Sequence, residues 1–200
     1  MIFFFLACFP TTPKKPTSSL EVDLHSLTQQ VGLAAQDSEH LCEAITTARA
    51  LRPSVQEALT AGKLNETALA EVPGLVLRGS DVHVDWPELS QAIGQGPTSA
   101  ALITIGGVES IIHRPCMDVS KLSHWVSRTS SFKDAPACVQ KLLSNQLKEL
   151  MIHASTAPCV CSAPPETALK QINSRLDELG INTDQKISWP TTWPVCATEP

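Results

Sequence analysis

The chain of 200 residues contains no tyrosine, and only 4% of its residues are aromatic. Because aromatic side chains fill much of the buried volume in most domains, the core of this protein must be built from Leu, Ile, Val and Ala, which pack readily between helices. Charged residues are also few, at 18%, while hydrophobic residues make up 42%. This is the composition of a folded chain, and its length fits one domain with flexible ends.

Clusters of positive charge are missing as well. The formal net charge is −5, and the clearest basic pair is Lys14 with Lys15. A surface that follows a nucleic-acid backbone needs many clustered Lys and Arg side chains. Nucleic acid is therefore not favoured as a partner.

The sequence has no apolar run of the length that crosses a bilayer. Residues 1–9 are apolar, but the run stops at Pro10, well short of the ~20 residues that a transmembrane helix needs. No basic residue precedes the run as in a secretion signal. We expect no transmembrane segment, although an acyl chain on Cys8 would attach the protein weakly to a membrane.

The seven cysteines are not the even set of a disulfide-rich secreted domain. The odd count predicts reduced thiols and a cytoplasmic or otherwise intracellular location, with secretion less favoured. Some thiols could instead bind zinc, which prefers thiolate and imidazole ligands. The Cys-x-Cys spacing in the chain is not that of the usual zinc chelate. The candidate zinc ligands are His113, Cys116, Cys159 and Cys161.

Motifs of catalysis are also absent. The sequence contains no Gly-x-Ser-x-Gly, no His-Glu-x-x-His and no Gly-x-x-x-x-Gly-Lys, which would indicate a serine hydrolase, a zinc protease or a nucleotide phosphate loop. We therefore predict no catalytic residues and no cofactor. The alternative is a thiol- or zinc-dependent enzyme that uses the cysteines and histidines.

What the sequence does contain is a long apolar stripe. Residues 18–21 have the form of a helix-capping box, and apolar residues then recur at steps of three and four as far as Pro53, which disfavours further helix. The pattern predicts one helix over 18–52. Its stripe is either a coiled-coil seam between copies of the chain or the core-facing side of a bundle helix, and the Ala and Ser residues on it favour the second. The main stripe residues are Leu24, Leu27, Val31, Leu41 and Ile45.

The middle of the chain indicates strands. Two pairs of apolar segments lie within 75–113, one pair flanking a turn at Gly79 and the other flanking Gly106-Gly107. Each pair predicts a hairpin. The expected fold is α+β and mainly helical, with helices packed on a small antiparallel sheet of two hairpins. Apolar periodicity predicts the two later helices over 135–154 and 165–179.

A single globular domain is expected over 18–182. Residues 1–17 are predicted to be a disordered apolar tip and a proline-rich linker, and residues 183–200 an extended tail. Trp189 and Trp193 in this tail each precede a proline. An aromatic side chain in a stiff, extended segment is typical of short linear ligands.

These features predict a non-enzymatic adaptor or assembly subunit that binds protein partners. In the coiled-coil interpretation it also oligomerises through its first helix. The expected contacts are made by the stripe residues named above and by Trp189 and Trp193. An oligomerising helix ahead of a compact domain resembles, in architecture alone, some viral polymerase cofactors, which keeps a viral accessory role as an alternative.

Overall fold

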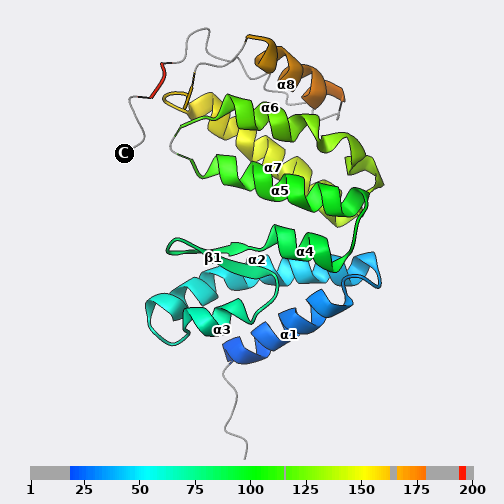
Figure 1. The fold of residues 1–200 in the computed structure, drawn as a ribbon, viewed down its shortest axis with the longest axis vertical. Helices are drawn as coiled ribbons and strands as arrows, with labels where there is room; N and C mark the ends of the chain where they lie inside the picture. The colour runs from blue at the N-terminus through cyan, green and yellow to red at the C-terminus, as the bar shows by residue number, and fades with distance from the viewer. Residues whose placement is uncertain (1–18, 115, 163–165, 179–193, 197–200) are drawn as a thin grey trace, which may run out of the picture.

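The structure, a computed structural model, describes residues 19–114, 116–162, 166–178 and 194–196. Across these ranges it is mainly helical with one small antiparallel sheet, as the sequence predicts. Its elements form two halves stacked along the long axis of the molecule (Figure 1). The N-terminal half contains α1 (Ser19–Leu33), α2 (Ser38–Thr60), α3 (Glu66–Ala70), β1 (Leu75–Arg78), β2 (Asp81–Val84) and α4 (Trp86–Ala92). The C-terminal half contains α5 (Pro97–Ile112), α6 (Val119–Ser127), the 3-10 helix η1 (Thr129–Asp134), α7 (Ala137–Thr156) and α8 (Glu166–Glu178).

The prediction of one helix over 18–52 is wrong, because α1 ends at Leu33 and α2 begins at Ser38 after a turn. Asp37 sets this second start. Its Oδ1 accepts hydrogen bonds from the backbone N–H groups of Glu39 and His40, each at 2.9 Å, as an N-cap side chain does. The turn folds the apolar stripe back on itself, so that α1 and α2 pack against each other.

Pro53 does not end the helix, since it lies inside α2. A proline within a helix removes one backbone N–H and crowds the carbonyl four residues earlier. Here that carbonyl belongs to Arg49, and both residues are exposed. Water can therefore hydrate the freed oxygen, which explains why the outer side of α2 tolerates this proline.

The strands β1 and β2 form the first predicted hairpin. Leu75 pairs with Val84 and Arg78 with Asp81, and Gly79 takes the positive φ of 63° that the tight turn requires. The hairpin packs on α2. This part of the sequence prediction is confirmed.

The second predicted hairpin is wrong, because its residues belong to α5. Pro97 lies in the first turn of this helix, and Gly106-Gly107 lies near its middle rather than at a turn. A helix that is buried on most sides is apolar nearly throughout, so a short stretch of it has the same pattern as buried strands. The side chains that α5 buries follow helical spacing and include Ala101, Leu102, Ile105, Val108 and Ile111.

The helices predicted over 135–154 and 165–179 are confirmed as α7 and α8. α7 supplies the central apolar face of the C-terminal half and packs on α5, while α8 packs on α6. One continuous cluster of buried apolar side chains extends from Leu24 in α1 to Leu176 in α8. The two halves therefore share a core.

Six of the seven cysteines are paired, which corrects the prediction of reduced thiols. The Cα atoms of the three pairs are 6.0, 5.1 and 5.2 Å apart, within the range that a disulfide spans. Cys8 lies outside the described residues. The disulfides are Cys42–Cys138, Cys116–Cys161 and Cys159–Cys196.

These disulfides act at two different places. The bond between Cys42 and Cys138 joins α2 to α7 and so connects the two halves. The other two bonds hold one end of the C-terminal half, where Val160 forms parallel bridges with Met117 and Val195. Because persistent disulfides are typical of oxidising compartments, the pairing removes the observation on which the predicted intracellular location rested.

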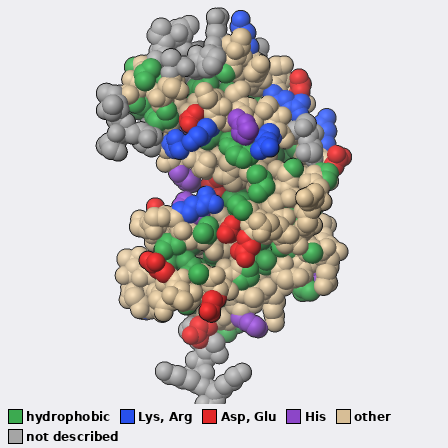
Figure 2. Space-filling model, viewed as in Figure 1, with side chains coloured by type: hydrophobic (Ala, Val, Ile, Leu, Met, Phe, Trp, Pro, Cys, Tyr) green, Lys and Arg blue, Asp and Glu red, His purple; other side chains and the backbone are tan. Residues whose placement is uncertain are grey.

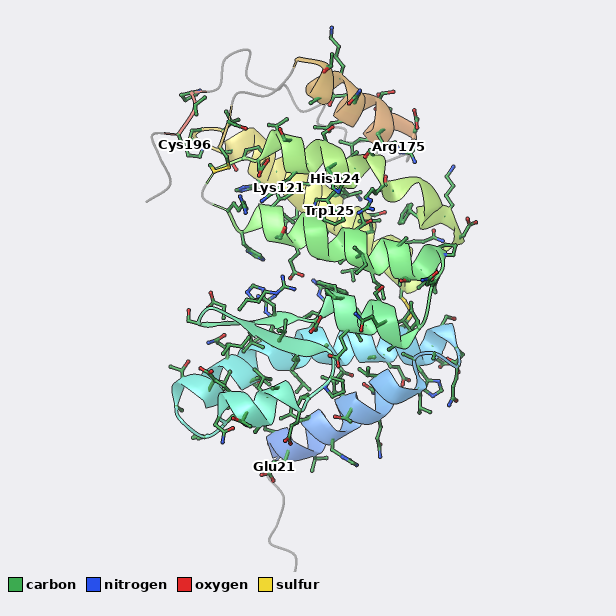
Figure 3. The ribbon with its side chains drawn as sticks, in the orientation of Figure 1. Glu21, Lys121, His124, Trp125, Arg175 and Cys196 are labelled. Carbon is green, nitrogen blue, oxygen red and sulfur yellow. A yellow bond between two sulfur atoms is a disulfide. The ribbon has the colours of Figure 1, made fainter. Side chains whose placement is uncertain are left out.

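Much of the two chain ends lies outside the described residues, including the predicted linker over 1–17 and both tail tryptophans. Residues 194–196 are described, and they attach to the C-terminal half through Val195 and the disulfide of Cys196 (Figure 3). Within the described ranges, none of the helices combines the length and the apolar character that a bilayer crossing demands.

Candidate partner-binding groove between α5 and α6

Two adjacent glycines in the middle of α5 each make room for a tryptophan. A Cβ atom on Gly106 would lie 2.9 Å from Cδ1 of Trp86, and a Cβ atom on Gly107 would overlap the ring of Trp125. Trp86 comes from α4 and Trp125 from α6. Glycine inside a helix costs about 1 kcal/mol relative to alanine, and these close contacts offset that cost. Successive residues are turned by about 100° around a helix, so the rings approach α5 from different directions.

Trp86 is enclosed between the two halves. Its side chain is 2% exposed, and its Nε1–H donates a hydrogen bond to Oε2 of Glu109 in α5 at 2.5 Å. The second carboxylate oxygen of Glu109 accepts a hydrogen bond from Nη1 of Arg52 in α2 at 3.2 Å. The indole therefore has its polar atom satisfied, and the contact joins elements of both halves.

Trp125 is only half-buried. It lies between α6 and α5 (Figure 3), where the guanidinium carbon of Arg128 is 5.7 Å from the ring centroid, within cation–π range. The ring of His124 meets it edge-on, with centroids 5.0 Å apart. Unlike Trp86, this tryptophan keeps part of its ring open to solvent.

An open groove of about 480 Å³ lies beside Trp125. Binding sites combine mostly apolar walls with a few polar groups that fix the orientation of the ligand. This groove has an aromatic ring, an aliphatic wall and one guanidinium. Its lining residues are Ala100, Ile103 and Thr104 from α5, and Trp125, Ser127 and Arg128 from α6 and its C-terminal end.

The exposed side of α6 next to the groove is basic. Lys121, His124 and Arg128 are exposed, and with Trp125 they recur at helical spacing and share one face. Figure 2 shows Lys, Arg and His side chains gathered over this part of the C-terminal half. Asp118, which caps α6, lies 3.6 Å from Nζ of Lys121 and so neutralises part of this charge.

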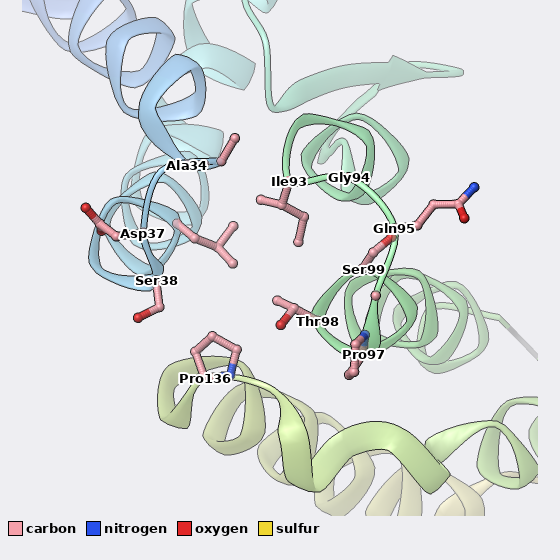
Figure 4. Close-up of a pocket in the computed structure, with 13 residues that line it drawn as sticks. Ala34, Asp37, Ser38, Ile93, Gly94, Gln95, Pro97, Thr98, Ser99 and Pro136 are labelled. Atoms are coloured by element: carbon pink, nitrogen blue, oxygen red, sulfur yellow. The ribbon is translucent and has the colours of Figure 1, made fainter.

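A second cleft, of about 300 Å³, lies where the two halves meet (Figure 4). The turn between α1 and α2 forms one wall, the loop between α4 and α5 forms another, and Pro136 borders the opening. Its charged group is Asp37, whose pKa is lowered chiefly by the backbone N–H of His40 and then by the imidazole of the same residue. This carboxylate is engaged in capping α2, so the cleft offers a partner less than the groove at Trp125 does.

Histidine side chains and side chains of Lys or Arg lie beside a hollow between the halves (Figure 2). Burial is the main cause that lowers the pKa of His83 on β2; the charge of Arg52 lowers it further, and Glu109 opposes both. Burial also lowers the pKa of His153 in α7, with a smaller contribution from His113. A lowered pKa favours the neutral form of both imidazoles over the protonated form.

The predicted contact residues of the first helix lie in the core. Each is between 0 and 7% exposed, so no partner can reach it in the folded chain. The stripe is the core-facing side of two bundle helices, which is the interpretation that the sequence favoured, and it is not a seam open to another copy. These residues are Leu24, Leu27, Val31, Leu41 and Ile45; Trp189 and Trp193 lie outside the described residues.

The structure corrects the predicted zinc site. Cys116 is bonded to Cys161, and Cys159 to Cys196, and a sulfur in a disulfide is not the thiolate that binds zinc. His113 is exposed at the C-terminal end of α5. In the part of the chain that the structure describes, no three His, Cys, Asp or Glu side chains are placed to hold a metal ion.

No family model, no curated protein and no solved structure matches this chain. Function is therefore inferred from the residues of the groove. Sequence reasoning missed Trp125 and Arg128, because only the fold brings them to α5. The signal in the sequence for these contacts was the pair Gly106-Gly107. It indicates that a tryptophan ring packs on each glycine only once the segment is known to be a helix.

Proposed function

We propose that the protein is a non-enzymatic adaptor or assembly subunit that binds an acidic protein segment in the α5–α6 groove. The observation that carries this proposal is the half-exposed ring of Trp125 beside an apolar wall and the Arg128 guanidinium. Tryptophan and arginine are enriched among the residues that dominate the energy of protein interfaces. The arrangement fits a partner with an apolar side chain for the groove and a carboxylate for Arg128.

The groove is also rigid before a partner arrives. Its walls are helices, and the missing side chain of Gly107 lets the ring of Trp125 pack directly on α5. The ring of Trp125 therefore has little side-chain freedom left to lose on binding, and a preorganised anchor binds more tightly for this reason. The basic edge formed by Lys121, His124 and Arg128 would attract an acidic partner and speed its association.

The three disulfides support an oxidising compartment as the place where this binding happens. They also engage the cysteines on which the alternative of a thiol- or zinc-dependent enzyme depends. We propose a binding role in place of that alternative.

The test selects ligands for the groove from random peptides, so the natural partner need not be identified first. A random peptide library is displayed against the oxidised full chain, and peptides that do not bind it are washed away. The remaining peptides are synthesised with a fluorophore, and their Kd values are measured by anisotropy. We expect acidic sequences with an apolar anchor, which bind Trp125→Ala at least about 30-fold more weakly, the loss typical of a central anchor residue.

Two further variants make the test specific. Arg128→Glu should weaken the same peptides most at low salt, since salt screens exposed charges. Val22→Ala is the matched control, because Val22 is an apolar side chain on α1 that is 54% exposed and far from the groove in sequence and fold. Peptides that bind all four proteins equally, or a selection that yields no acidic peptide, would contradict the proposal.

A further inference from the structure

The N-cap and first two residues of α3 form the tripeptide Asn65-Glu66-Thr67, the one match in the sequence to the Asn-x-Ser/Thr acceptor of N-linked glycosylation. Such tripeptides arise often by chance, so the placement of this one matters. All three residues are exposed. The segment lies at the outer end of the N-terminal half, away from α5 and α6 (Figure 1).

The two polar atoms of the Asn65 side chain have different surroundings. Its Oδ1 accepts a hydrogen bond from the backbone N–H of Ala68 at 2.7 Å and so caps α3. In the described part of the chain, Nδ2 donates no hydrogen bond. A sugar attached to Nδ2 would leave Oδ1 in place, so glycosylation is compatible with the folded cap.

The local backbone also suits an acceptor. Asn65 itself is extended, with φ −108° and ψ 162°, and α3 has only five residues. A helix this short is marginal on its own, so Glu66 and Thr67 can leave the helical conformation without loss of the larger core. Around Gly62, earlier in the same turn, even an added Cβ would meet no atom within 4 Å, so this side of the turn is open to an enzyme.

The disulfides supply an independent reason to expect this modification. Three native disulfides indicate folding in an oxidising compartment, and in a secreted protein an Asn-x-Ser/Thr match marks a surface acceptor. This step rests on the compartment proposed above and not on the groove. The exposed tripeptide and the disulfides point to the same cellular environment from unrelated parts of the molecule.

We propose that Asn65 carries an N-linked oligosaccharide. In the transfer, Nδ2 of Asn65 attacks the anomeric carbon of a lipid-diphosphate-linked oligosaccharide. A carbon–nitrogen bond forms, the bond from the anomeric carbon to the diphosphate oxygen breaks, and the lipid diphosphate leaves with the electron pair. One proton of Nδ2 passes to a base of the transferase, and no oxidation or reduction takes place.

The test expresses the full chain behind a cleavable secretion signal in eukaryotic cells, so that it enters the oxidising compartment. The purified protein is analysed by intact mass before and after treatment with a peptide-N-glycosidase, and its free thiols are counted by alkylation. We expect one glycan, removed by the enzyme with an aspartate left in place of Asn65. Thr67→Ser should keep the glycan.

Two variants should abolish the glycan without weakening α3. Asn65→Asp keeps an oxygen that caps the helix, and Thr67→Ala leaves Asn65 unchanged. A protein that has its disulfides but no glycan would overturn this inference and leave the proposed compartment standing. A protein with reduced thiols and no glycan would overturn both, while the peptide measurements on oxidised protein would still decide the groove separately.

Discussion

The N-terminal half and the C-terminal half each contribute one tryptophan that packs on α5, and the two tryptophans differ in their exposure to solvent. Trp86 is 2% exposed and donates a hydrogen bond to Glu109. Trp125 rests on the neighbouring glycine with part of its ring in an open groove. Both tryptophan rings thus pack on a glycine of α5, but Trp86 is part of the buried core and Trp125 is part of an exposed groove.

The difference shows that tight packing does not by itself make a residue structural. Trp86 has lost its solvent and gained a polar partner, so its removal would leave a cavity and an unsatisfied carboxylate. Trp125 packs as closely on α5 but keeps exposed ring surface. Only the second can gain further buried area when another molecule binds.

Replacing each tryptophan by alanine should reveal the largest difference between the two residues, in the free energy of unfolding. Trp86→Ala should lower the free energy of unfolding by about 3–5 kcal/mol, the range for a large buried aromatic. Trp125→Ala should lower it by only about 1 kcal/mol, because its ring is partly solvated already. Denaturant unfolding without reducing agent measures both. Equal losses would mean that Trp125 is a core residue and would remove the basis of the groove.

The glycine seats offer a sharper test through a double-mutant cycle. Gly107→Ala places a methyl group where the ring of Trp125 lies, so we expect a loss of about 1–3 kcal/mol, as for an overpacked site. The same substitution in a Trp125→Ala background should cost nothing, or stabilise by up to about 1 kcal/mol through helix propensity.

Gly32→Ala in α1 is the control for that cycle, since a Cβ there would meet no atom within 4 Å. It should stabilise the protein by up to about 1 kcal/mol, whichever residue stands at position 125. A Gly107→Ala variant that behaves like Gly32→Ala would show that Trp125 does not depend on its seat.

The smallest expected effect concerns the hollow between the halves. The pKa of His83 is lowered in the folded protein, mainly by burial, from the ordinary value of 6.5. Below that pH the unfolded chain binds a proton at His83 more readily than the folded protein does. The free energy of unfolding should therefore fall as the pH drops through and below 6.5. Above 6.5 this group should not change it. His83→Gln should flatten the decline measured by urea unfolding between about pH 7.5 and about pH 5.5. A decline of unchanged steepness in this variant would contradict the prediction.

Local signals predicted much of the fold. The turn at Gly79 and the apolar faces of α7 and α8 are visible in the sequence because each is set by neighbours along the chain. The break at Asp37 was missed because the stripe continues through it in register. An aspartate is compatible both with the interior of a long helix and with the N-cap of a new one, so Asp37 alone did not predict the break.

The site was beyond such reasoning for a different reason. Gly106-Gly107 has two meanings, a turn between strands or a pair of seats on a helix, and the choice depends on Trp86 and Trp125, which lie about 20 residues away on either side. Cysteine pairing is likewise non-local. An odd count suggested free thiols, although six of seven cysteines form bonds and the count itself does not exclude this.

The arrangement of disulfides also determines how the protein responds to mechanical force. If the chain is pulled from Ser19 and Cys196, tension passes through two disulfides, and only residues 19–42 and 138–159 carry it. That path of about 46 residues extends to roughly 160 Å, whereas the uncrosslinked chain would reach roughly 620 Å. The loop closed by the Cys42–Cys138 disulfide, residues 43–137, bears no load. It contains the hairpin, Gly106-Gly107 with both tryptophans, and the groove. Because α5 packs on α7, which lies on the loaded path, the groove should keep its shape only until tension unfolds α7.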